Sequence, residues 1–145
     1  MIAGVRLRNY RARDFDRICE IDARCFSNGL HYTPPEMRTF LKGAWAMVAQ
    51  NRRGTVVGFV MTRRNRVVTL DVLPEYRRRG IGRALMEACE KRMQPGKAML
   101  EVGVRNREAQ ALYRALGYTR VKRLPCYYPN GEDGWLLEKT CLPGS

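Results

Sequence analysis

Residues 77–82 bring three arginines and two glycines together at the start of a predicted helix. The stretch reads Arg77-Arg78-Arg79-Gly80-Ile81-Gly82 and follows an apolar run typical of a strand. Glycine lets the backbone approach a ligand closely, and the free N–H groups at a helix N-terminus favour negative charge. Arginine side chains would add charge-assisted hydrogen bonds. Together these features predict an anion-binding loop suited to a pyrophosphate.

Two common phosphate-binding loops do not fit this pattern. A P-loop needs Gly-Lys-Ser/Thr, which does not follow here, and a Rossmann loop needs a third glycine where the sequence has Arg83-Ala84-Leu85. A plainer interpretation stays open at this point: a helix that begins at a glycine turn and carries exposed arginines.

The elements that must position this loop alternate along the chain. Apolar patterning predicts strands at 2–8, 45–50, 56–63, 66–73, 98–104, 118–124 and 134–140. Helical periodicity predicts helices after Asp14, from Pro34 to about Gly43, from Ile81 to the sequence Gln-Pro-Gly-Lys, and from Asn106 to Gly117. We therefore expect a single α/β (α+β) domain over residues 1–145, with a mixed, mostly antiparallel sheet of about six to seven strands, about four helices and a parallel strand–helix–strand unit in the middle.

Composition limits the partners and the compartment. The chain has 27 Lys+Arg against 14 Asp+Glu, a net charge of +13, which favours nucleic acid, an acidic membrane surface or a polyanionic small molecule. Five scattered cysteines without a Cys-x-x-Cys pair argue against a zinc or redox motif and for free thiols in the reducing cytosol. No apolar run approaches the roughly 18 residues of a membrane span. We expect a cytoplasmic protein with no membrane partner and no metal.

Two segments together resemble the GNAT superfamily of N-acetyltransferases. The stretch "RRRGIG" matches its Arg/Gln-x-x-Gly-x-Gly/Ala motif, and "VRNREAQALYRALGY" matches its Asn-x-x-Ala-x-x-Leu-Tyr-x-x-x-Gly-Phe/Tyr segment. Within the superfamily the chain is most similar to the ribosomal-protein alanine N-acetyltransferase (RimI-type) group, through "LEV" at 100–102 and "YYP" at 127–129 followed by "ED" at 132–133. The segment "FSNGLHYTPPE" lacks the usual Pro-Trp of that group.

The resemblance implies the GNAT fold and acetyl-CoA as the acetyl donor. In that family the main-chain amides of the loop bind the pyrophosphate, and the strand before it bonds the pantetheine arm. Asn106 would contact the pantetheine or its bound water, although a role as helix cap alone stays open. The cofactor-binding residues expected on this basis are Asp71, Val72, Leu73, Arg77, Arg78, Arg79, Gly80, Ile81, Gly82, Arg83, Ala84 and Asn106.

Acetyl transfer from a thioester to an amine needs a base for the amine proton and an acid for the thiolate. The resemblance places the base at Glu101, which alternates with Met99 and Gly103 in an apolar strand, where partial burial would raise its pKa. It places the acid at Tyr113, which shares a helix face with Leu112 and Leu116. An exposed strand carboxylate and a core tyrosine are the plainer alternatives.

Three tyrosines are expected to bind the acceptor. The resemblance implies that Tyr127 and Tyr128 line the substrate channel, and Tyr32 lies in a second loop that would border it. Packing at the end of a strand is the alternative for Tyr127 and Tyr128. The predicted entry for the acceptor amine lies between loops 27–36 and 125–133, opposite the cofactor.

Three classes of function are compatible with these observations. The first is acetylation of a protein N-terminus, with possible proximity to the ribosome, and the second is acetylation of a lysine side chain or a small amine such as a polyamine. The third is a nonenzymatic acyl-CoA sensor or a basic RNA-binding module. The chain carries no RNA-recognition signature, and its arginines spread over loops and strands. Glu101 and Tyr113 favour catalysis over sensing, while the oligomeric state is left open between monomer and dimer.

Overall fold

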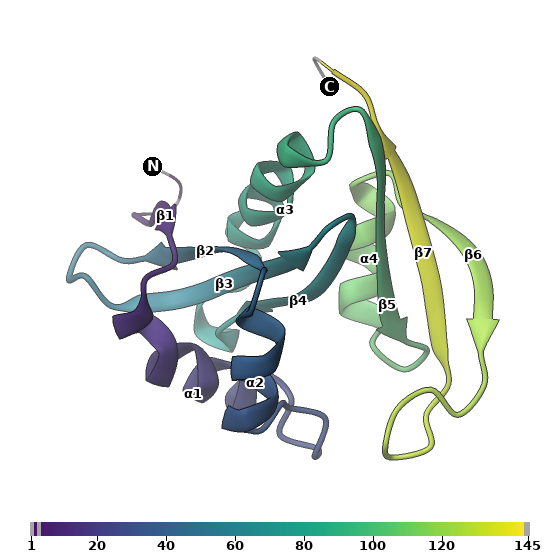
Figure 1. The fold of residues 1–145 in the computed structure, drawn as a ribbon, viewed down its shortest axis with the longest axis horizontal. Helices are drawn as coiled ribbons and strands as arrows, with labels where there is room; N and C mark the ends of the chain where they lie inside the picture. Colours follow the sequence, from purple (N-terminus) through teal and green to yellow (C-terminus); the bar gives the residue numbers. More distant parts are fainter. Residues whose placement is uncertain (1, 3, 144–145) are drawn as a thin grey trace.

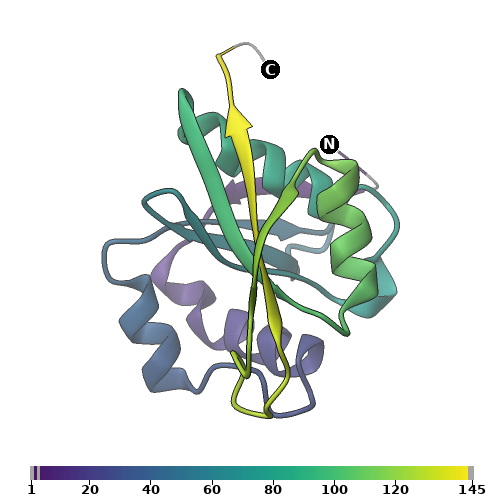
Figure 2. The ribbon, with the colours of Figure 1, turned by 90° about the vertical axis from the view of Figure 1, so that its right-hand side faces the viewer.

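A seven-stranded sheet organises the protein (Figures 1 and 2). The computed structural model describes Ile2 and residues 4–143. The strands lie in the order β1-β2-β3-β4-β5-β7-β6. Their bounds are Arg6–Asn9 (β1), Trp45–Gln50 (β2), Val56–Arg63 (β3), Arg66–Val72 (β4), Gly96–Gly103 (β5), Thr119–Leu124 (β6) and Gly134–Cys141 (β7). The mixed, mostly antiparallel sheet expected from the sequence is confirmed.

Within the described residues, four α-helices cover the sheet: α1 (Phe15–Cys25), α2 (Pro34–Leu41), α3 (Ile81–Arg92) and α4 (Arg107–Ala115). Figure 1 shows α1 and α2 below strands β2 to β4 and α3 above them, while α4 lies beside β5. Residues 56–62 of β3 are all buried, because α1 packs on one face of this strand and α3 on the other. The core therefore extends through the sheet on both sides of its N-terminal half.

The sheet divides between β4 and β5. These two strands are parallel, and they pair only at Arg66 and Met99, near the start of β4. Every other neighbouring pair is antiparallel and extends over four or more positions. Beyond Met99 the two strands diverge, so the main-chain groups on the facing edge of β4 lack a partner strand. The parallel unit predicted from the sequence is thus present, and it contains the opening that a ligand needs.

Some predicted boundaries need correction, and Asp14, which the sequence offers as a plausible cap of the first helix, does not act as one. The strand expected at 2–8 is observed at Arg6–Asn9, with an isolated bridge between Ile2 and Val5, and Ala3 lies outside the described residues. Asp14 precedes α1 but does not cap it, because its carboxylate accepts hydrogen bonds from the Arg8 guanidinium and the Arg11 amide. These two donors hold the pKa of Asp14 below its usual range, with the Arg8 hydrogen bond the largest cause.

Helix α2 begins as predicted. Thr33 and Glu36 form a reciprocal capping box across its first turn, with Pro34 and Pro35 inside the helix start. The helix ends at Leu41, before the Gly43 expected from the sequence.

Two further features concern the environment of the chain. All five cysteines are free, as the sequence predicts. Among the described residues, no helix has the length and apolarity needed to cross a membrane. The single domain expected over residues 1–145 stays a prediction.

Candidate active site

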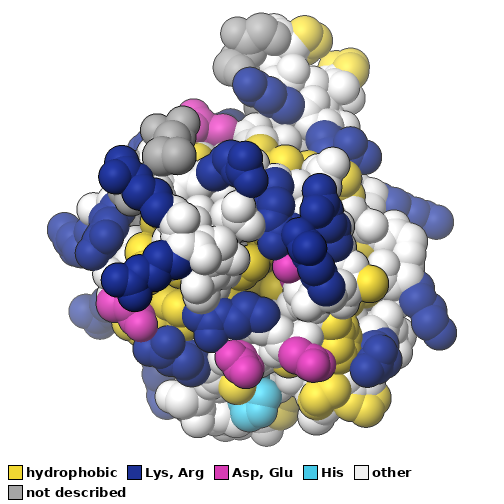
Figure 3. Space-filling view, turned by 90° about the vertical axis from the view of Figure 1, so that its left-hand side faces the viewer, with side chains coloured by type: hydrophobic (Ala, Val, Ile, Leu, Met, Phe, Trp, Pro, Cys, Tyr) yellow, Lys and Arg dark blue, Asp and Glu magenta, His cyan; other side chains and the backbone are white. Residues whose placement is uncertain are grey.

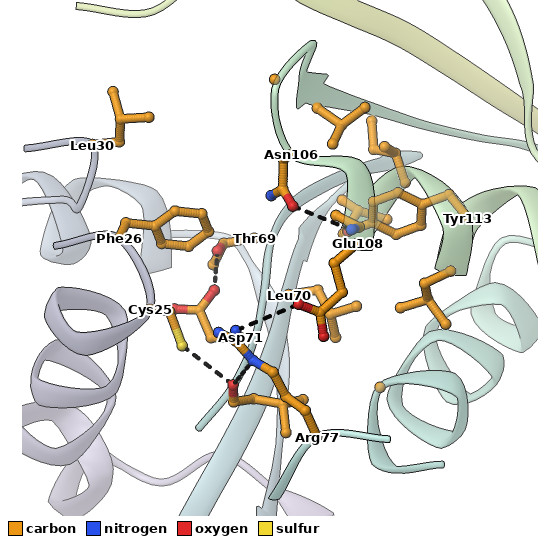
Figure 4. A pocket seen from close by; sticks show the side chains of 18 of the residues that line it. Cys25, Phe26, Leu30, Thr69, Leu70, Asp71, Arg77, Asn106, Glu108 and Tyr113 are labelled. Carbon is orange, nitrogen blue, oxygen red and sulfur yellow. Dashed lines mark hydrogen bonds and ion pairs between the residues drawn. The ribbon is translucent and has the colours of Figure 1, made fainter. Parts of the chain in front are cut away.

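A cavity of about 1160 Å³ occupies the place where β4 and β5 separate. Its walls come from α1 and the loop after it, from β4 and β5, from the loop and first turn of α3, from α4, and from the loop between β6 and β7. Figure 4 shows Cys25, Phe26 and Leu30 on one side of this space, and Asn106 and Tyr113 on the other. Most of the side chains singled out in the sequence are thereby brought to one place.

The predicted anion-binding loop forms one end of the cavity. Arg78 and Gly80 both adopt positive φ, 61° and 85°, and turn the chain into α3. The first intrahelical bond runs from the Ala84 amide to the Gly80 carbonyl. In the described part of the chain, the six amides of residues 78–83 donate no hydrogen bond. Six free N–H groups at a helix N-terminus fit an anionic ligand such as a pyrophosphate.

Gly82 keeps the space beside these amides open. A Cβ placed on it would lie 3.4 Å from Leu112 Cδ2, 3.8 Å from Leu70 Cδ2 and 3.9 Å from Val72 Cγ2. Any side chain at this position would therefore extend between α4 and β4, into the opening where β4 and β5 separate. The hydrogen side chain of Gly82 leaves room for a chain-like ligand, which fits acetyl-CoA.

The arginines of the loop do not all face the cavity. The Nε of Arg77 donates to the Val72 carbonyl at 2.9 Å, and its Nη1 lies 3.9 Å from Glu108 (Figure 4). The Arg79 guanidinium lies over the Tyr76 ring at 5.1 Å. Arg77, Arg78 and Arg83 line the cavity, whereas Arg79, Ala84 and Leu73 do not. Arg77 thus ties the loop to β4 and α4.

The edge of β4 offers the main-chain groups expected for the pantetheine arm at only some of the predicted positions. The Leu73 amide bonds to the Val57 carbonyl on β3, so it is used within the sheet. Alternate residues of an antiparallel strand direct their main-chain groups to opposite edges, which turns those of Val72 toward β5. The Val72 carbonyl is occupied by Arg77 and by the Cys25 thiol at 3.4 Å. Its amide is therefore the group best placed to bind a ligand.

Glu101 lies on β5 with its side chain 12% exposed and contributes to the cavity wall. Its carboxylate forms an ion pair with Arg66 at the start of β4, whose side chain is 47% exposed. An adjacent cation favours the ionised form of a carboxylate. The structure therefore places at the cavity wall a carboxylate that is held by an ion pair with Arg66.

Tyr113 projects from α4 and is 7% exposed. Its ring packs edge-on against Tyr118 at 5.7 Å, and its hydroxyl has no hydrogen-bond partner among the described residues. Burial, and then the charge of Asp71, raise the pKa of Tyr113 above its usual value. The hydroxyl is therefore protonated at neutral pH and can donate. In this geometry Tyr113 can both pack its ring in the core and act as the proposed acid through its hydroxyl.

Asn106 caps α4, since its Oδ1 accepts the Ala109 amide at 3.2 Å. This leaves the Nδ2 group free at the cavity wall.

Replacing Asn106 with alanine should lower the free energy of unfolding by about 1 kcal/mol, the usual contribution of an N-cap. Urea denaturation at several acetyl-CoA concentrations would measure this change. Thr33→Ala, which removes the cap of α2 away from the loop 77–83, is the matched control. If both variants bind acetyl-CoA as the wild type does, the role of Asn106 is limited to the cap.

The three predicted acceptor tyrosines border the opposite end of the cavity. Tyr127 and Tyr128 contact each other edge-on at 5.0 Å, and Tyr32 contacts Phe40 at 4.7 Å. Burial raises the pKa of Tyr32 to about 12, and Asp22 and Tyr127 contribute to this shift. Tyr127 affects the pKa of Tyr32 and lines the same cavity, so the loop that carries Tyr32 and the loop between β6 and β7 face each other. Figure 2 shows these two loops at the bottom of the molecule.

Several residues at the site were not predicted. Asp22 on α1 lines the cavity next to Asp71. Arg66 forms an ion pair with Glu101, and Glu108 forms one with Arg77. One signal for Asp22 was present in the sequence: it lies on the same helix face as Ile18 and Ile21, where an apolar residue is expected. The two ion pairs join positions 35 and 31 residues apart, beyond the reach of local patterns.

Comparison with known proteins agrees with this geometry. The acetyltransferase (GNAT) family matches residues 15–118. An N-alpha-acetyltransferase of Sulfurisphaera tokodaii is 34% identical over 91% of this chain and 90% of its own length. Among solved structures, Ard1 from Thermoplasma volcanium has a TM-score of 0.86 at 26% identity, covering 97% and 99% of the two chains. The ribosomal-protein-S18-alanine N-acetyltransferase from Escherichia coli shares the fold, with a TM-score of 0.84 at 21% identity, covering 97% and 96%. The family resemblance is confirmed, and this chain belongs to the GNAT family of acetyltransferases.

Proposed function

We propose that this protein transfers the acetyl group of acetyl-CoA to the α-amine of a protein N-terminus. The observation that carries the proposal is one cavity with an anion-binding end and an aromatic end, and with Glu101 and Tyr113 in its wall. The relatives described as N-alpha-acetyltransferases, 34% and 32% identical over most of their length, support the same acceptor. Binding of acetyl-CoA by the loop 78–83 and Val72 is part of this proposal.

The residues have distinct tasks in the proposed reaction. Acetyl-CoA supplies an acyl group on a thiolate leaving group. An α-amine, with a pKa of about 8, is partly protonated at neutral pH. Glu101, paired with Arg66, accepts the amine proton directly or through water. Tyr113, kept protonated by burial, donates to the departing sulfur.

The acceptor end favours a short, unbranched start to the peptide. Tyr32, Tyr127 and Tyr128 provide rigid walls and hydroxyl groups that can fix a peptide backbone. A long first side chain would meet these rings before the amine reached the thioester. We therefore propose alanine and serine as preferred first residues.

The positive charge supports an acceptor that is presented next to a polyanion. Figure 3 shows Lys and Arg side chains over most of the face at the left of Figure 1, with few acidic side chains between them. A net charge of +13 exceeds what one CoA requires. It would repel a strongly basic peptide and attract RNA. Proximity to the ribosome therefore remains part of the proposal.

A panel of acceptors tests this function. Peptides that begin with Ala or Ser should be acetylated faster than peptides that begin with Met or an acidic residue, and faster than an internal-lysine peptide or a polyamine. Mass spectrometry identifies the acetylated nitrogen. Tyr128→Ala should reduce the discrimination among first residues by about tenfold, because one pocket wall is removed, and Tyr128→Phe should retain it.

Other results of the panel would replace the proposal with a stated alternative. Faster acetylation of internal lysine than of every free N-terminus would contradict the N-terminal assignment. Reaction with polyamines alone would make the peptide channel wrong and leave a small-amine acetyltransferase. Acetyl-CoA binding without turnover on any acceptor would identify a sensor.

A further inference from the structure

Two buried carboxyl groups lie against each other beside the acceptor end of the cavity. Asp22, one turn before the end of α1, and Asp71, on β4, are each 1% exposed. The Asp71 carboxyl lies within hydrogen-bonding reach of the Asp22 carboxyl. The proposed reaction does not use either side chain.

Each carboxyl group has one satisfied and one unsatisfied oxygen. Asp22 Oδ2 accepts the Tyr32 amide at 2.7 Å, and Asp71 Oδ1 accepts the Thr69 hydroxyl at 2.5 Å (Figure 4 shows the latter). Asp22 Oδ1 and Asp71 Oδ2 are buried and have no donor among the described residues. Two ionised carboxylates so close together repel each other, whereas one shared proton would satisfy both free oxygens.

The proton belongs mainly to Asp71. Burial, followed by the hydrogen bond and charge of Asp22, raises the pKa of Asp71 well above its usual range. Asp22 accepts the main-chain N–H of Tyr32 through its Oδ2. The surroundings of Asp71 therefore favour its protonated form, which can donate to the free oxygen of Asp22.

The neighbouring titratable groups do not supply an alternative partner. Arg77 opposes protonation of Asp71 by its charge, but its nitrogens bond to Val72 and face Glu108. Cys25 donates to Val72, and burial raises its pKa to about 11. Burial likewise keeps Tyr32 and Tyr113 neutral. Among the described residues, none of these neighbours donates a hydrogen bond to Asp22 Oδ1 or Asp71 Oδ2.

Asp22 connects the pair to the acceptor loop, residues 26–33. Its carboxylate bonds to the Tyr32 amide at the far end of this loop, and its carbonyl accepts the Phe26 amide at the near end. Both ends of the acceptor loop are therefore fixed through Asp22, and the Tyr32 ring is placed against the cavity. Asp71 in turn belongs to β4, the strand that would border the pantetheine arm of acetyl-CoA.

We propose that Asp22 and Asp71 act as a one-proton latch, which positions the acceptor loop for the incoming amine and opens when the shared proton is lost. Both are positioning residues, since they border the cavity but their free oxygens are buried. The effect on peptide acceptors rests on the proposed function, whereas the shared proton itself does not.

Asp71→Asn distinguishes the latch from a site that binds the substrate ammonium directly. The asparagine amide can donate to Asp22 the hydrogen bond that the shared proton supplies, and it does not titrate. In the wild type, KM for an Ala-starting peptide should rise at alkaline pH, while in Asp71→Asn it should stay low and constant. A large loss of acceptor binding in Asp71→Asn, or the same alkaline rise as in the wild type, would overturn the latch.

Asp71→Leu removes the donor and keeps the approximate size. It should raise the acceptor KM about tenfold or more at neutral pH, with little change in kcat or in acetyl-CoA affinity, because Asp22 loses its donor. Asp16→Asn, on an exposed position of α1, is the matched control and should change nothing. An unchanged KM in a folded Asp71→Leu protein would contradict the proposal.

Two measurements without any acceptor test the shared proton separately. Infrared spectra of protein labelled with ¹³C-aspartate should show a protonated carboxyl band at neutral pH that Asp71→Asn removes. The folded state holds this proton where the unfolded chain has lost it. The stability of the wild type relative to Asp71→Asn should therefore fall as pH rises from about 4 to the raised pKa of Asp71. Absence of the band and of this slope would refute the latch, even if N-termini are acetylated, and their presence would support it even if no N-terminus reacts.

Discussion

Replacing Glu101 with glutamine is expected to lower the acetylation rate by roughly 10²–10⁴-fold, the usual contribution of a general base. Glutamine keeps the size of the side chain and can still accept a hydrogen bond from Arg66, but it cannot take a proton. Affinity for acetyl-CoA should stay close to that of the wild type, because the anion-binding loop lies on α3 rather than on β5. Steady-state rates with an Ala-starting peptide, and calorimetry with acetyl-CoA, would measure the two effects.

A second variant shows whether the Arg66 ion pair sets the protonation of this base. Arg66→Gln removes the cation that favours the ionised carboxylate, so the rising limb of the rate should move to higher pH. The shift should be modest, because Arg66 is half exposed.

Glu138→Gln is the matched control for Glu101→Gln, since Glu138 is an ion-paired strand carboxylate on β7 that does not line the cavity. Full activity of Glu101→Gln at pH 7 would assign the proton to water or another group.

Much of the architecture follows from local signals in the sequence. The glycine pair at 80 and 82, the cap at Asn106 and the stop at Gly117 each act within one helical turn, and each is present where the pattern predicts it. The parallel unit follows from the order strand, helix, strand, which needs a crossover connection. The resemblance to GNAT acetyltransferases, rather than these local signals, is what assigned the loop 77–83, Glu101 and Tyr113 to one site.

The contacts that tune these residues could not be predicted, because they join distant parts of the chain. Arg77 was expected to bind the cofactor and does line the cavity, but its contacts with Val72 and Glu108 were not predicted. Glu101 appeared to depend on burial, yet Arg66 on the neighbouring strand holds it. Asp22 is a charged residue on the apolar face of α1, which the sequence shows, but only the tertiary structure brings Asp71 next to it.

Gly82→Val is expected to weaken acetyl-CoA binding by about a hundredfold or more. The valine methyl groups would extend toward Leu112, Leu70 and Val72, where a Cβ alone is already in contact at 3.4–3.9 Å. They would hold a phosphate away from the amides of residues 78–83. Hydrogen bonds to charged groups contribute about 1.5–3 kcal/mol each, so the loss of two gives an effect of this size. Calorimetry with acetyl-CoA would measure it.

Comparing Gly82→Ala with Gly82→Val distinguishes steric blocking of the ligand from damage to the fold. Gly82 has no positive φ, so Gly82→Ala should fold normally and lose less affinity than Gly82→Val. Ala88→Val places the same β-branched residue in α3 away from the cavity and should bind acetyl-CoA normally. Acetyl-dephospho-CoA lacks only the 3′-phosphate and retains the pyrophosphate, so Gly82→Val should weaken its binding by the same factor. Unchanged affinity for both ligands in folded Gly82→Val would show that the pyrophosphate binds elsewhere, and a loss confined to acetyl-CoA would assign the loop to the 3′-phosphate instead.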